Sequence, residues 1–134
     1  MLQREVAAKI AARPGDEGYG PLSLAAAMFG EIEIVITLEP HVFFPRPPVT
    51  SAVVAFRRKP PALDVPSATL WTAIKGLFNH RRKTIANGVK SLGAFVKNGE
   101  SSAAIIAQAG LAQERRPETL SLQEFAAIVK ACGY

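Results

Sequence analysis

The sequence has few of the residues that form cross-links and metal sites. Its 134 residues include one cysteine, Cys132, and two histidines, His41 and His80. A single cysteine excludes an internal disulfide framework and a cysteine-based zinc site, and it is typical of proteins kept in a reducing cytoplasm. We therefore predict a cytoplasmic protein without a metal site.

Long hydrophobic runs are also missing. No apolar stretch approaches the roughly 18 residues that a membrane span requires, and the chain does not open with the charged and apolar regions of a signal peptide. We therefore expect no contact with a membrane. Hydrophobic residues nevertheless make up 49% of the chain, which is enough to bury a core and excludes general disorder.

Common catalytic motifs do not occur in the sequence. It contains no G-x-G-x-x-G motif, no P-loop and no G-x-S-x-G motif, and no pair of carboxylates has a spacing suited to acid–base catalysis. Cys132 lies on an apolar helical face, which indicates a core residue rather than a nucleophile. A lone histidine such as His41 is more often structural than catalytic.

The charge is positive and unevenly distributed. The formal net charge is +5, and residues 61–134 carry nine basic and five acidic side chains, whereas residues 1–60 carry seven and six. A basic region of this kind attracts polyanions such as nucleic acids. The alternative is a basic soluble protein that has no such partner.

Three prolines in residues 57–66 (RRKPPALDVP) indicate a linker or domain edge. We therefore divide the chain into a first part at residues 1–59, a linker at 60–66 and a second part at 67–134. In the second part apolar residues recur with the helical period, and Ser67, Ser101 or Ser102, and Ser121 stand where they could cap helices. This part is predicted to be a small all-α domain.

The first part mixes helices with strands. Its patterns predict helices over residues 3–12 and 21–29 and strands over 31–38 and 51–58. The second strand is apolar on both faces, so we expect both faces to be covered. Two strands alone form a marginal sheet, so we interpret this part as the tail of a larger α/β sheet. A complete small α+β domain, or a dimer that shares strands, is the alternative.

The segment between the two strands, EPHVFFPRPPVTS (residues 39–51), contains four prolines that stiffen it. Phe43 and Phe44 stand side by side in it, close to Arg46. An aromatic ring on a rigid loop near an arginine is suited to stacking on a nucleobase. The alternative is that one of the two rings caps the core of the sheet.

A second basic feature lies at the junction of two predicted helices, in FNHRRKT (residues 78–84). Arg81, Arg82 and Lys83 are consecutive, so within one helix they could not share a face. At a corner between helices they could project together toward phosphates, which arginine binds through two parallel hydrogen bonds. The alternative is a solvated run of charge.

Taken in order, five segments of the chain resemble the rRNA adenine N6-dimethyltransferase family, specifically the small-subunit dimethyladenosine transferases. The patterns F-x-P-x-P-x-V-x-S and F-N-x-R-R-K-T carry most of the resemblance, which spans nearly the whole chain. The matching segments are MLQREVAAKIAARPG (1–15), YGPLSL (19–24), VFFPRPPVTSAVV (42–54), FNHRRKTIANGV (78–89) and RPETLSLQEF (116–125).

The resemblance implies a Rossmann-like methyltransferase domain followed by a small helical domain. Members of the family use S-adenosylmethionine to dimethylate N6 of two adjacent adenosines in small-subunit rRNA, and they act on the immature 30S subunit. The target base is flipped out of its stack. The resemblance implies that Phe43 stacks on this adenine and that Arg81, Arg82 and Lys83 contact the RNA backbone. We also predict Arg46, in the proline-rich loop, as an RNA-binding residue.

The chain also departs from the family pattern. Pro48 and Thr50 stand where the family commonly has Lys and Asp, and Ala86 stands where another Arg is frequent. The first change removes one potential phosphate contact from the loop and makes the loop stiffer.

The family's cofactor motifs are missing from the 134 residues. The glycine-rich loop, the acidic ribose-binding residue and the N-L-P-Y motif precede, in the family, the segment that matches Met1. We therefore expect this chain to correspond to the C-terminal half of such an enzyme and to be catalytically silent in isolation. The alternatives are a non-catalytic module that binds rRNA or the 30S subunit, and a fragment that self-associates through an unpaired strand or an exposed sheet face.

Overall fold

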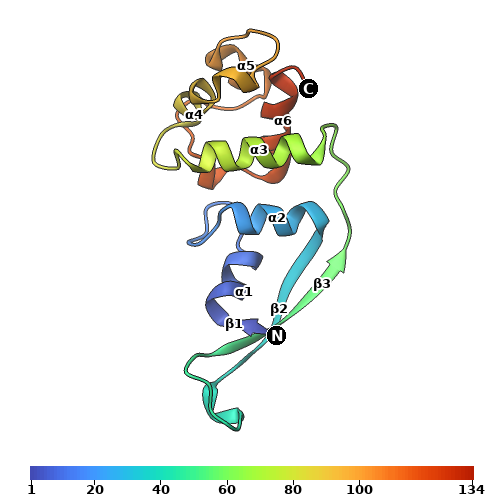
Figure 1. The fold of residues 1–134 in the computed structure, drawn as a ribbon, viewed down its shortest axis with the longest axis vertical. Coiled ribbons are helices and arrows are strands. Elements are labelled where there is room, and N and C mark those ends of the chain that lie inside the picture. Colours follow the sequence, from blue (N-terminus) through green and yellow to red (C-terminus); the bar gives the residue numbers. More distant parts are fainter. The chain divides into compact units, whose positions relative to one another are not determined.

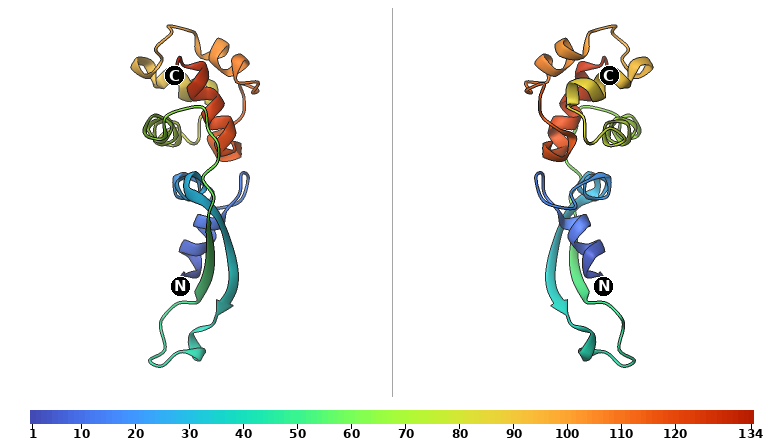
Figure 2. Two further views of the ribbon diagram at one scale, coloured as in Figure 1. Left: turned by 90° about the vertical axis from the view of Figure 1, so that its right-hand side faces the viewer. Right: turned by 90° about the vertical axis from the view of Figure 1, so that its left-hand side faces the viewer.

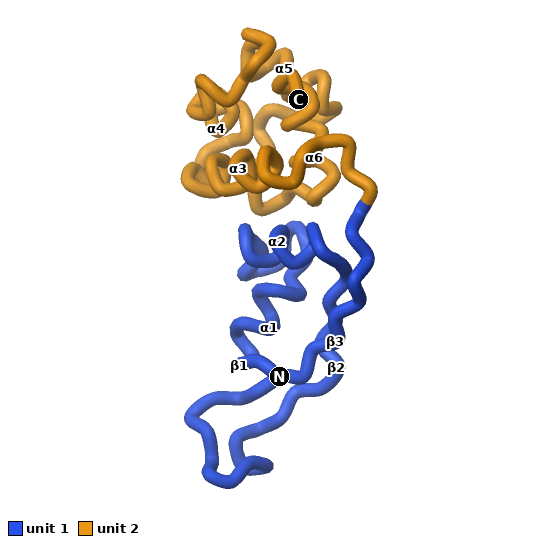
Figure 3. The backbone as a smooth tube through the Cα atoms, turned by 45° about the vertical axis from the view of Figure 1, so that its right-hand side comes forward, with its two compact units in different colours: residues 1–61 blue, residues 62–134 orange.

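The computed structural model describes residues 1–134, and they divide into two compact units (Figure 3). The first unit is Met1–Pro61 and the second is Ala62–Tyr134. The division lies inside the proline-rich segment at residues 57–66. Helices and strands together confirm the mixed α/β content that the sequence predicts.

The first unit combines two helices with a small antiparallel sheet (Figure 1). The strand order is β1-β3-β2, so that β3 is hydrogen-bonded on both edges. The sequence predicts only two of these three strands. It does not predict β1, because two residues are too few to show an alternation of apolar and polar side chains. The elements are β1 (Leu2–Gln3), α1 (Arg4–Ala11), α2 (Pro21–Phe29), β2 (Gly30–Leu38), the 3-10 helix η1 (Pro40–Val42) and β3 (Ser51–Arg58).

A β-bulge interrupts the long hairpin of β2 and β3. Ile34 lies opposite Val54 and Ile36 lies opposite Val53, so Val35 has no partner on the other strand. An extra residue of this kind bends a strand and increases its twist. An alternation of side chains between the two faces of the strand therefore does not continue across Val35.

The expectation that β3 is covered on both faces is wrong for this structure. Ala52 is fully buried, but the exposed fraction of Phe56 is 51%. The helices of the unit cover the sheet only in part, and the second half of β3, from residue 55 to residue 58, is exposed.

The two helices of the first unit are joined by a buried serine. Pro21 begins α2, where its missing N–H costs nothing. The hydroxyl of Ser23 in α2 donates to the carbonyl oxygen of Lys9 in α1, and it accepts from the Gly20 N–H at 3.2 Å. These hydrogen bonds hold the end of α1 against the start of α2.

The second unit consists of helices packed around one apolar core (Figure 2). Phe125 is fully buried and stacks on Phe78, with ring centroids 5.8 Å apart. None of the helices combines the length and apolarity needed to cross a bilayer. The elements are α3 (Ser67–Phe78), α4 (Ile85–Ser91), η2 (Gly93–Phe95), α5 (Ser102–Gln108), η3 (Pro117–Thr119) and α6 (Leu122–Ala131).

Polar side chains begin three of these helices. Ser101 caps α5, and Ser121 forms a capping box with Glu124 at the start of α6, as the sequence predicts. The cap predicted at Ser67 is wrong, because Ser67 is already the first helical residue and Pro66 precedes it without a side-chain hydrogen bond. Thr84, for which no cap was predicted, caps α4.

Candidate nucleic-acid interface

The proline-rich loop joins β2 to β3 and extends beyond the helices of the first unit (Figure 2). Hydrogen bonds close its base. The Arg4 N–H donates to the Thr50 carbonyl oxygen at 2.9 Å, and the Thr50 hydroxyl donates to the Glu39 carboxylate at 3.2 Å. With both ends fixed and four prolines in residues 39–51, the loop presents its side chains with little conformational entropy left to lose.

The two adjacent aromatic residues of the loop have different surroundings. Phe43 is half-buried, whereas the side chain of Phe44 is exposed to the full extent possible for the residue, at 102%. Neither ring lies in the buried core. Arg46 is exposed, and none of the ion pairs of the structure includes it.

Arg81, Arg82 and Lys83 form the turn between α3 and α4, which we call the basic turn. Its backbone is held by hydrogen bonds from Arg81 N–H to Phe78 O (3.2 Å) and from Lys83 N–H to His80 O (2.8 Å). All three side chains are exposed, and none pairs with a carboxylate. The basic turn therefore presents three uncompensated positive charges to solvent.

A second segment, distant in the sequence, lies beside the start of α4. Ile85 N–H donates to the carbonyl oxygen of Arg115 at 2.7 Å, and Ala86 N–H donates to that of Gln113 at 3.4 Å. Arg116, next in this segment, is exposed and has no ion pair. Arg116 is not among the predicted site residues, although two consecutive arginines, Arg115 and Arg116, are visible in the sequence.

Arg115 has a structural partner. Both terminal nitrogens of its guanidinium donate to the Glu124 carboxylate, and one also donates to the Thr119 carbonyl oxygen at 2.6 Å. Partial burial by itself would raise the pKa of Glu124, but the Arg115 guanidinium and the Ser121 N–H, 3.0 Å away, hold this pKa below its usual value. Arg115 thus anchors the segment, and Arg116 remains available to a ligand.

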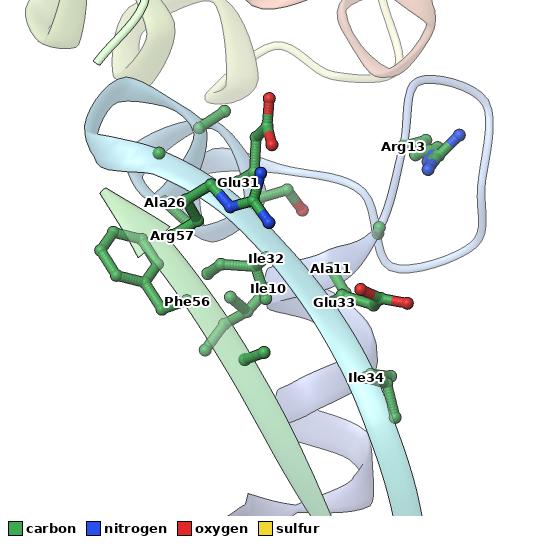
Figure 4. A pocket seen from close by; sticks show the side chains of 15 residues that line it. Ile10, Ala11, Arg13, Ala26, Glu31, Ile32, Glu33, Ile34, Phe56 and Arg57 are labelled. Carbon is green, nitrogen blue, oxygen red and sulfur yellow. The ribbon is translucent and has the colours of Figure 1, made fainter. Parts of the chain in front are cut away.

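A cavity of about 1060 Å³ lies between the helices and the sheet of the first unit (Figure 4). None of the predicted site residues lines it. Its one glycine, Gly30, is required by the fold, because a Cβ there would lie 2.1 Å from the Arg57 carbonyl oxygen. The lining of this cavity therefore lacks the open glycine-rich turn that lets a backbone approach a nucleotide cofactor.

The single cysteine thiol of the chain, that of Cys132, is not reactive. Cys132 is fully buried, and desolvation raises the pKa of its thiol to about 11. The thiol is protonated at neutral pH and packs in the core of the second unit, in agreement with its interpretation as a core residue. No cluster of three or more histidine, cysteine or acidic side chains is arranged to hold a metal ion.

Comparisons with known proteins agree with one another. The model of the family described as ribosomal RNA adenine dimethylase matches residues 1–132. The chain is 37% identical to ribosomal RNA small subunit methyltransferase A of Bacillus mycoides (strain KBAB4), over 98% of this chain and 46% of that protein. It therefore spans about half the length of the curated relatives it matches.

Two solved structures share the fold. A dimethyladenosine transferase from Plasmodium falciparum superposes with a TM-score of 0.79 at 18% identity, covering 95% of this chain and 54% of that one. The 23S rRNA methyltransferase ErmE superposes with a TM-score of 0.61 at 17% identity, covering 98% of this chain and 52% of that one.

The pair of Arg115 and Glu124 predicts a pH-dependent contribution to stability. Replacing Glu124 by Gln should lower the free energy of unfolding at pH 7 by about 1 kcal/mol, because the charged hydrogen bonds are lost. Since the pKa of Glu124 is lowered on folding, this stabilisation is complete above the ordinary glutamate pKa and is lost as the pH falls through the folded value. Urea unfolding at pH 7 and pH 3 measures the difference.

Glu114→Gln serves as the matched control, because Glu114 is exposed, lies in the same segment and has no ion pair. It should leave the stability unchanged at both pH values. A difference between wild type and Glu124→Gln that is as large at pH 3 as at pH 7 would show that the ion pair is not its origin.

Proposed function

This chain belongs to the ribosomal RNA adenine dimethylase family, and on that premise we propose that it forms the RNA-facing part of a cytoplasmic, S-adenosylmethionine-dependent enzyme that dimethylates N6 of two adjacent adenosines in small-subunit rRNA. One observation carries the proposal: the basic turn holds three exposed cations, and none of them has a carboxylate partner. In immature 30S subunits, rRNA phosphates would supply the missing negative charge.

The chemistry of the basic turn suits an RNA backbone. Arg81 and Arg82 can each bind a phosphate through two parallel hydrogen bonds, whereas Lys83 acts as a point charge. Three cations outside the basic turn pair with carboxylates of the chain: Lys59 with Glu31, Arg115 with Glu124 and Lys130 with Asp64. The exposed Arg116 extends the same positive surface beside α4.

The proline-rich loop suits the target base. Phe43 is half-buried, so its ring is supported by the chain while part of it remains accessible. We propose that this ring stacks on the flipped adenine, which would contribute about 1–3 kcal/mol, and that Arg46 contacts the neighbouring backbone. Orienting the adenine in this way fixes the direction in which its amino group can react.

We further propose that these 134 residues bind rRNA without transferring a methyl group by themselves. The proposal is supported by the lining of the cavity in the first unit, which has no open glycine-rich turn for a nucleotide cofactor. An alternative is a non-catalytic module that binds rRNA or the 30S subunit through the helical unit alone. In that case Phe43 contributes nothing to binding.

The absence of methyl transfer can be measured directly. The chain, incubated with radiolabelled S-adenosylmethionine and immature 30S subunits, should incorporate no label above background. The intact Bacillus mycoides relative, tested on the same subunits, shows whether they are competent substrates. Incorporation by the 134-residue chain would contradict the proposal.

The basic turn is tested by replacing Arg81, Arg82 and Lys83 together with alanine. If each cation neutralises one phosphate, the slope of log K against log salt for small-subunit rRNA should become shallower by about 2–3, and binding should weaken. The measurement is a salt titration of RNA affinity.

The chain offers a control of identical composition, since Arg57, Arg58 and Lys59 repeat the Arg-Arg-Lys order in the first unit. Their replacement by alanine changes the net charge equally and should leave the slope nearly unchanged. Equal effects of the two triple variants would mean that net charge, and not the basic turn, drives binding.

A specific observation favours self-association as a second candidate function. β2 lies at the edge of the sheet, so its outer backbone groups have no strand partner. Val35 and Ile36 on this strand are 61% and 50% exposed. Unpaired apolar edges of this kind can pair with another chain, and a second copy would supply a matching strand.

Sedimentation velocity over a range of concentrations tests this candidate. If β2 pairs between copies, the wild-type chain should form a dimer that dissociates on dilution, and Val35→Lys should abolish it by placing a charge on the edge. Val42→Lys, in the proline-rich loop, should leave the dimer intact. A wild-type chain that sediments as a monomer at every concentration would rule out strand sharing.

A further inference from the structure

We propose that Phe44 is a second stacking residue, which holds an unpaired nucleobase next to the target adenosine. This rests on the proposed function, because it assigns a second nucleotide to the same loop. Phe44 is the most exposed large hydrophobic side chain of the protein, at 102%, compared with 68% for Met1. The whole ring is therefore accessible to a partner.

The backbone directs the two rings of the loop to different partners. Phe43 has extended dihedral angles, with φ −109° and ψ 150°. An extended residue directs its side chain and the next one to opposite sides of the chain, and on this basis we assign Phe43 and Phe44 to different bases. Phe43, which is half-buried, fits a base held against the protein, whereas Phe44 fits a base that approaches from solvent.

The charges around the loop favour a nucleotide as the occupant. The only acidic side chain of residues 39–50, Glu39, accepts a hydrogen bond from the Thr50 hydroxyl. Arg46 in the loop and Arg4 at its base are exposed and have no ion pair. An accessible π-face beside unpaired cations complements a base with its phosphates.

The rigidity of the loop strengthens this assignment. Phe44 precedes Pro45, and Pro47 and Pro48 follow within four residues. A ring held by such a segment loses less conformational entropy on stacking than one on a flexible loop. Because every base offers a π-face, this contact would tolerate different nucleotides at the flanking position.

The test uses the full 134-residue chain and a hairpin RNA with two adjacent unpaired adenosines, in which 2-aminopurine replaces the flanking nucleotide. Wild-type protein should quench the 2-aminopurine fluorescence on binding. Phe44→Ala should remove this quenching and weaken binding by about 5- to 150-fold. Phe44→Trp should retain both effects, and Phe44→Leu, which is apolar but lacks a π-system, should behave as Phe44→Ala.

Val42→Ala is the matched control, because Val42 is an exposed apolar residue of the same loop, at 54%. It should change affinity less than twofold. Since all these side chains are exposed, thermal unfolding should be the same for every variant.

The outcomes separate the two proposals. If Phe44→Ala binds and quenches as wild type does while alanine at the basic turn still weakens binding, the assignment of Phe44 is overturned and the proposed function stands. If neither change affects RNA binding, both are overturned. If Phe44→Ala leaves RNA binding intact and instead abolishes binding to vesicles containing anionic lipid, the ring contacts membranes and the assignment is also overturned.

Discussion

The pairing of β3 along both of its edges is the constraint on which the proline-rich loop depends. Ser51, the first residue of β3, lies opposite Leu38 at the end of β2 and opposite Gln3 in β1. The last residue before the loop and the first after it are thereby fixed against each other. Thr50, the residue before Ser51, is in turn hydrogen-bonded to Arg4 and Glu39. The short sheet therefore positions Phe43 and Phe44, although the helices leave much of the sheet exposed.

In the second unit the distribution of ion pairs determines which cations can act on a ligand. Glu124 accepts hydrogen bonds from Arg115, and this pair holds the segment beside α4. Arg116 and the basic turn have no such partners. An ion-paired arginine, Arg115, and an unpaired one, Arg116, thus stand next to each other in the sequence, and only their contacts distinguish them. The buried core around Phe125 gives the turn between α3 and α4 a fixed support.

Much of the fold was predictable from the sequence, because periodicity and capping residues are local signals. The helix over residues 21–29 and the cap at Ser121 follow directly from them. The strand β1, the bulge at Val35 and the missing cap at Ser67 did not, since they depend on pairing partners and on the path of the preceding chain. The sequence also could not show that Phe44 is more exposed than Phe43, or that Arg115 forms an ion pair and Arg116 does not. Both differences arise from contacts made only in the folded chain.

The central claim is that the proline-rich loop and the basic turn both contact small-subunit rRNA. Titrating the isotope-labelled chain with an rRNA hairpin and following its backbone amide resonances tests this most directly. The amides of residues 43–44 and 81–84 should shift together and saturate at the same RNA concentration, while those of β2 near Val35 stay unchanged. Shifts confined to the cavity of the first unit or to β2, with both segments unaffected, would contradict the claim.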